Sequence, residues 1–165
     1  FSINLFKYGG NMARNDESNA AQGGVSEELD ALSCDLLGSA LDALAAGSDV
    51  LAVVALEDEH NTRISRSFIN DTPEACIEAA RNYVQGLIAS SGDKNSGLDM
   101  PVRYALVYEG AVENTDGAFD DALILEFAEK GTQAYSAYVL WDGFGAGENL
   151  AWTDPAPAGE VESLF

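Results

Sequence analysis

A helical repeat of apolar residues, followed directly by a run of strand length, restricts what this chain can fold into. The apolar positions recur every three or four residues: Leu29, Leu32, Leu36, Ala40 and Leu44. Ser26 is a suitable N-cap for this segment, and Gly47 is a suitable end. Residues 50–56 then form a continuous aliphatic and β-branched run. The sequence therefore predicts an amphipathic helix that leads into a strand.

The rest of the chain predicts a second helix and four more strands. Residues 62–69 alternate apolar and polar side chains, and we expect them to pair with residues 50–56 as a hairpin. Residues 70–74 supply a capping side chain, an early proline and an early acid, which together predict the start of the second helix. The remaining three strands are expected at residues 102–108, 121–127 and 135–141.

Short connections between these strands favour antiparallel neighbours, so we expect one α+β domain with a mainly antiparallel five-stranded sheet. The two amphipathic helices would cover one face of that sheet. The domain is expected to span residues 26–142, with residues 1–25 as a poorly structured or packing arm and residues 143–165 as a Gly- and Pro-rich tail. The order of elements resembles that of the small αββαβββ domains of the roadblock and profilin-like kind. This resemblance, which rests on element order alone, implies a platform for binding or dimerisation.

The charge of the chain restricts its partners. It carries 28 acidic against 8 basic side chains, a formal net charge of −20. Such a charge repels nucleic acid and anionic membranes, so we expect neither as a partner. Cys34 and Cys76 form no CxxC pair and stand beside no histidine, which favours reduced thiols in a cytoplasmic protein over a zinc site. A disulfide between them would require α-carbons within ~7 Å.

Two acidic clusters are candidates for cation binding. Asp116, Asp120 and Asp121 lie in a turn-rich segment, and Ca²⁺ takes about six to eight oxygen ligands from such loops. The same residues also suit the backbone of a plain hairpin loop, which we favour. The second cluster, residues 57–60, ends in the only histidine, His60. Four successive side chains on a turn point in different directions, so we expect these residues to be solvated.

The late strands carry five aromatic side chains that form a candidate binding interface: Tyr104, Tyr108, Tyr135, Tyr138 and Trp141. Because side chains alternate along a strand, both faces of these strands are apolar or aromatic. One face would pack against the helices. We expect the other to be covered either by a partner subunit or by the chain itself, through residues 1–8 or the segment around Leu150 and Trp152.

These observations favour a non-enzymatic acidic binding or scaffold domain that self-associates through its aromatic face. The chain has one histidine and no nucleophile motif, so an enzyme is the less favoured interpretation, and we expect no cofactor. The alternative is a carboxylate-based domain that binds divalent metal, or a metal-dependent hydrolase, built on Asp116, Asp120 and Asp121 with Glu57 or His60. A third interpretation is a partner for a basic protein, attracted by the acidic surface.

Overall fold

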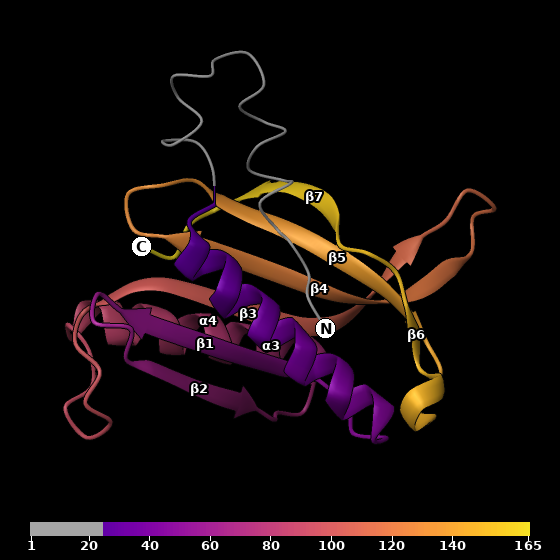
Figure 1. The fold of residues 1–165 in the computed structure, drawn as a ribbon, viewed down its shortest axis with the longest axis horizontal. Helices are drawn as coiled ribbons and strands as arrows, with labels where there is room; N and C mark the ends of the chain where they lie inside the picture. Colours follow the sequence, from indigo (N-terminus) through magenta and orange to yellow (C-terminus); the bar gives the residue numbers. More distant parts are fainter. Residues whose placement is uncertain (1–24) are drawn as a thin grey trace, which may run out of the picture.

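Residues 25–165 are described by a computed structural model, in which two α-helices, one short 3-10 helix and seven strands follow one another (Figure 1). The elements are α3 (Glu27–Ala45), β1 (Ala52–Asp58), β2 (Arg63–Phe68), α4 (Pro73–Ala89), β3 (Pro101–Glu113), β4 (Phe119–Glu129), β5 (Ala134–Asp142), η1 (Gly147–Asn149), β6 (Ala151–Trp152) and β7 (Ala156–Val161). Residues 1–24, nearly all of the expected N-terminal arm, lie outside the described residues. The α+β class is confirmed.

All strand pairs of the sheet are antiparallel, in the order β2-β1-β3-β4-β5-β6, with β7 also paired to β5. The expected β1–β2 hairpin is present, with Ala52 opposite Phe68 and Glu57 opposite Arg63. The far ends of β3 and β4 form a hairpin that projects beyond the rest of the sheet (Figure 1).

The prediction of five strands is wrong, because the segment after β5 adds two more. β6 and β7 cover the edge of β5 that faces away from β4. Pro157 lies at the register shift between Ser136 and Ala137, the kind of irregular edge position where a strand tolerates a residue without an N–H group. Gly159 has a φ of +110°, in the left-handed region that favours glycine. The short β6 and the Pro and Gly of β7 leave no strand pattern in the sequence.

The prediction that both helices cover one face is also wrong, because α3 and α4 lie on opposite faces of the sheet (Figure 1). On β1, Ala55 packs in the cluster beneath α3, whereas its neighbours Val54 and Leu56 pack in the cluster beneath α4. Each face of the inner strands is therefore apolar and needs its own cover.

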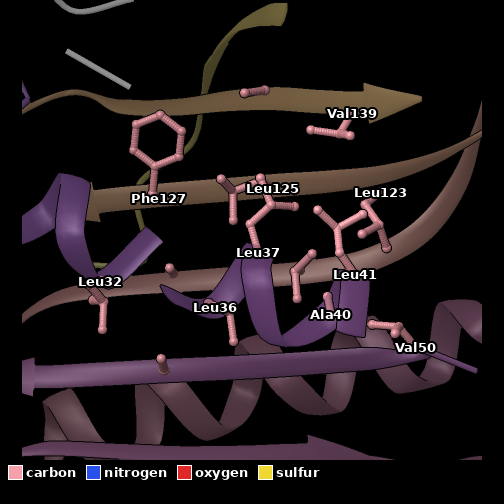
Figure 2. Close-up of a cluster of buried hydrophobic side chains, with 14 of the residues drawn as sticks. Leu32, Leu36, Leu37, Ala40, Leu41, Val50, Leu123, Leu125, Phe127 and Val139 are labelled. Atoms are coloured by element: carbon pink, nitrogen blue, oxygen red, sulfur yellow. The ribbon is translucent and has the colours of Figure 1, made fainter. Parts of the chain in front are cut away.

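The α3 side holds the larger cluster. Figure 2 shows Leu32, Leu36, Leu37, Ala40 and Leu41 on α3 beside Leu123, Leu125 and Phe127 of β4 and Val139 of β5. The helix begins where the Ser26 hydroxyl accepts the Leu29 N–H at 3.1 Å, as its N-cap role predicts. No helix within residues 25–165 is both long and apolar enough to cross a membrane.

The two cysteines are free thiols on the two helices, and so lie on opposite sides of the sheet. Cys76 on α4 is buried, and its Sγ accepts the backbone N–H of Asn70 at 3.1 Å. Cys34 on α3 is half-buried. Their placement gives no support to a disulfide between them.

Candidate functional site

The five aromatic side chains singled out in the sequence do not share one surface. Tyr104, Tyr108 and Tyr138 lie on the α4 side of the sheet, and Tyr135 and Trp141 lie on the α3 side. The expected alternation along β3 and β5 is therefore present, but the register distributes the aromatic residues over both faces.

On the α4 side, the end of the chain covers part of the sheet. Tyr104 is only 1% exposed, and its ring centroid lies 5.5 Å from that of Phe165. Its hydroxyl accepts the backbone N–H of Leu164 at 3.2 Å. The residues that follow β7 supply this cover, not the segment around Leu150, which packs beneath α3.

A buried carboxylate lies beside this covered patch. Glu126 belongs to β4 and is 7% exposed, with Leu106 of β3 and Ser136 of β5 as its direct cross-strand partners. Its neighbours in sequence, Leu125 and Phe127, point to the α3 cluster, so Glu126 points to the α4 side. An ionised group in this setting requires hydrogen-bonding partners, because burial without them is costly.

Two partners reach Glu126 from neighbouring elements. Arg81 of α4 donates from Nη2 to Oε2 at 2.7 Å, and Tyr108 of β3 donates its hydroxyl to the same Oε2 at 2.7 Å. Within residues 25–165, Oε1 of Glu126 accepts no hydrogen bond. One oxygen of a buried carboxylate is thus paired twice and the other is left available.

Glu126 lines a groove of about 730 Å³ between α4 and the residues of β7 and the C-terminus, which we call the Glu126 groove. Part of its polar lining comes from four elements and the C-terminal residues: Arg81, Asn82, Gln85, Tyr108, Glu126, Ser136 and Ser163. Val161 and Leu164 form part of its apolar wall. A groove with an apolar wall and a few convergent polar groups is the usual form of a binding site.

Burial and the Glu126 carboxylate both change the acid–base behaviour of its partners. Burial raises the pKa of Tyr108 well above the ordinary value of 10.0, and the hydrogen bond to Glu126 adds to this rise. Burial alone would lower the pKa of Arg81, but the hydrogen bond and charge of Glu126 outweigh burial and raise it. Tyr108 therefore stays neutral and Arg81 stays charged around neutral pH.

The rim of the groove is acidic. Glu74 and Glu78 of α4 and Glu162 beyond β7 line it together with Glu126, and among the described residues that line it Arg81 is the only basic one. Four carboxylates against one guanidinium favour a cationic group over an anionic one.

Sequence reasoning identified Tyr108 but missed Glu126 and Arg81. The available signal was Glu126 itself, a single acid within the apolar run of β4. Alternation along the strand places its side chain on the other face of the sheet from Leu125 and Phe127. Its pairing with Arg81 depends on the side of the sheet that α4 covers, which the pattern did not predict.

The acidic loop between β3 and β4 is a hairpin turn. The Oδ1 atom of Asn114 accepts the backbone N–H groups of Asp116 and Ala118, at 2.9 and 3.1 Å. Asp120 and Asp121 are successive residues of β4, so they point to opposite faces. The described residues contain no group of three or more metal-ligating side chains, so the alternative of a metal site at Asp116, Asp120 and Asp121 gains no geometric support.

The residues of the 57–60 cluster also diverge. Glu57 is buried against Arg103, whereas Asp58 accepts the backbone N–H groups of Thr62 and Asp99, each at 2.9 Å. His60 remains on the surface, 3.6 Å from the Glu59 carboxylate. Glu57 therefore links β1 to β3, and Asp58 stabilises the turn that follows β1.

Comparisons with known proteins give no further guidance to the site. No protein-family model, no curated protein and no solved structure matches the chain.

Proposed function

We propose that this protein is a non-enzymatic acidic binding domain that takes a lysine or arginine side chain of a protein partner into the Glu126 groove. The observation that carries the proposal is Glu126 in the groove lining, a largely buried carboxylate whose Oε2 is paired twice while its Oε1 accepts no hydrogen bond from residues 25–165. A charge-assisted hydrogen bond to this atom would satisfy the remaining acceptor of the carboxylate.

The charge of the whole chain supports the same class of partner. A net charge of −20 attracts a basic protein over a distance, while the rim acids Glu74, Glu78 and Glu162 act close to the groove. Self-association through one aromatic face has less support, because Tyr104 is already covered by Phe165 and the other aromatic residues are divided between two faces.

A labelled peptide of alternating lysine and glycine, titrated with the protein and followed by fluorescence anisotropy, tests this function. Glu126→Gln keeps the shape of the side chain and removes its charge. A hydrogen bond to a charged group contributes about 1.5–3 kcal/mol, so we expect this variant to bind about tenfold or more weakly.

Glu113→Gln is the matched control, because it changes the net charge equally at an exposed position on the projecting β3–β4 hairpin. This control should bind within about twofold of the unchanged protein in moderate salt. Equal losses in both variants would mean that the overall charge, and not the groove, attracts the peptide. Absence of binding to the unchanged protein would contradict the proposed function itself.

A further inference from the structure

The α4 side of the sheet carries a helix over only part of its width. Within residues 25–165, α4 packs chiefly over β1, β2 and β3, so most of β4 and β5 has no helix above it on this side (Figure 1). Ile124 of β4 and Tyr138 and Leu140 of β5 point to this uncovered part. Their sequence neighbours Leu125 and Val139 pack in the cluster beneath α3, and side chains alternate along each strand.

These side chains form a continuous apolar surface. Ile124 lies directly opposite Tyr108 of β3 and Tyr138 of β5, so the three form a row across neighbouring strands. Ile124, Tyr138 and Leu140 are half-buried, yet they pack in neither of the two buried clusters of the described residues. Contiguous apolar surface of this kind is typical of an interaction site. We call the surface of Tyr108, Ile124, Tyr138 and Leu140 the open face.

Acidic residues lie at both ends of the open face. Glu126 lies two residues along β4 from Ile124, on the same side of the sheet. At the other end, Asp120 and Asp142 are exposed and line one groove together with Leu140. Asp120 and Glu126 are both on β4, about 20 Å apart along the strand. Acids at both ends repel a second copy of this acidic chain and attract a basic partner.

We propose that the open face binds one amphipathic helix of the basic partner protein. One basic side chain of that helix enters the Glu126 groove, and a second one, about two heptads along the helix, meets Asp120 and Asp142. The apolar stripe between them packs on Ile124 and Tyr138. This inference rests on the proposed function, because it assigns a shape to the partner whose basic side chain Glu126 receives.

The dimensions and the pairing of the strands favour a helix over an extended segment. An extended segment binds by adding to a free strand edge, whereas β4 is paired on both sides, with β3 and β5. A helix satisfies its own backbone groups and is about 10 Å wide, close to the width of two strands about 4.8 Å apart. A helix of about 14 residues is about 21 Å long, which matches the separation of the two acidic ends.

Two labelled peptides of the same composition test the proposal by fluorescence anisotropy with the full chain. The first, about 18 residues long, places leucines on one helical face and lysines two heptads apart at the two ends of that face. The second distributes the same leucines around the helix. We expect the first peptide to bind at least about tenfold more tightly, because only its leucines reach the open face together. Equal affinities would overturn the proposal.

Substitutions on the open face locate the binding. Ile124→Thr removes apolar surface from the face with little change in size, and Ile69→Thr makes the same change at a residue that is 86% exposed and outside the face. We expect the first helical peptide to bind about fivefold more weakly to Ile124→Thr, at least about tenfold more weakly to Tyr138→Ser, and within about twofold to Ile69→Thr. Equal affinities for Ile124→Thr and Ile69→Thr would contradict a contact with the open face.

The lysine–glycine peptide separates this inference from the proposed function, because neither Ile124 nor Tyr138 lines the Glu126 groove. Ile124→Thr and Tyr138→Ser should bind it within about twofold of the unchanged protein, which also shows that both variants are folded. If this peptide still responds to Glu126→Gln while the helical peptide ignores both substitutions, the inference fails and the proposed function stands. If neither peptide binds the unchanged protein, both fail. A dimer in sedimentation that Tyr138→Ser dissociates would assign the open face to a second copy and overturn the inference.

Discussion

Arg103 of β3 donates a hydrogen bond from Nη1 to Oε1 of its direct cross-strand partner Glu57 on β1, at 2.7 Å, with both side chains buried. The pair belongs to a row of alternating charges that crosses four strands on the α3 side: Arg63, Glu57, Arg103 and Glu129. Each charge inside this otherwise apolar layer has a neighbour of opposite sign, which offsets the cost of its burial.

Arg103→Met should therefore strongly destabilise the fold. The substitution leaves the Glu57 carboxylate without its buried partner, a change that costs about 3–5 kcal/mol. Urea unfolding would measure the loss. Arg63→Met is the matched control, because Arg63 is at the partly exposed end of the row, and we expect it to cost about 1 kcal/mol or less. Combining Arg103→Met with Glu57→Leu should recover most of the loss, and failure to do so would contradict the pairing argument.

Much of the sheet is predictable from the sequence, because β1 to β5 each carry a long apolar or alternating pattern. The positions of the helices were not predicted, although a signal existed. Both Val53 and Val54 of β1 are apolar and point to opposite faces, so covering one face alone would leave the other in water. The strands after β5 could not be predicted from the sequence pattern. Pro157 and Gly159 interrupt the alternation in β7, and this strand forms because it pairs with the edge of β5 that faces away from β4.

The candidate site was predictable only in part, for a different physical reason. Aromatic content drew attention to Tyr108, but its partner Glu126 lies 18 residues away on β4, and Arg81 lies on α4. These contacts depend on the β3–β4 register and on the face that α4 covers. Neither is encoded in the local pattern around any of the three residues.

Asp58 makes the fold sensitive to acid. Burial alone would raise its pKa, but the backbone N–H groups of Asp99, Thr62 and His60 bond the charged form and outweigh burial, so the pKa lies below the ordinary value of 3.8. The folded state therefore releases this proton more readily than the unfolded chain. The resulting stability is present above pH 3.8 and is lost as the pH falls through the folded-state pKa.

Asp58→Asn tests this linkage. At neutral pH we expect a loss of about 1–3 kcal/mol, from weaker bonds to the three N–H groups. The difference in stability between the variant and the unchanged protein should shrink as the pH falls below 3.8. Comparing urea unfolding of the two proteins across this range separates Asp58 from the other carboxylates, and a difference independent of pH would contradict the assignment.

Two glycines of the region around α4 should respond oppositely to the same substitution. Gly86 lies inside α4, and a Cβ atom there would have no atom within 4 Å. Gly86→Ala should therefore stabilise the fold by about 0.5–1 kcal/mol, because alanine loses less backbone entropy on folding. Gly92 has a φ of +109°, and a Cβ atom there would collide with the carbonyl oxygens of Leu98 and Asp99. Gly92→Ala should cost at least about 1–3 kcal/mol, measured by the same urea unfolding.

Tyr108, which lines the Glu126 groove, should make the free energy of unfolding depend on pH in the alkaline range. Burial and the bond to Glu126 hold the pKa of Tyr108 above 10.0, so the folded state retains this proton when the unfolded chain has lost it. The free energy of unfolding should therefore fall as the pH rises above 10.0. Tyr108→Phe should reduce this fall, which urea unfolding at increasing pH would measure.

An absorbance titration of tyrosinate separates Glu126 from burial. The difference between the unchanged protein and Tyr108→Phe isolates the ionisation of this phenol. In a Glu126→Gln background the same difference should move to lower pH, because the neutral amide neither repels the phenolate nor accepts its proton as strongly as the carboxylate. An ionisation that stays at the same pH would show that burial alone controls Tyr108, and that the 2.7 Å contact with Glu126 contributes nothing to it.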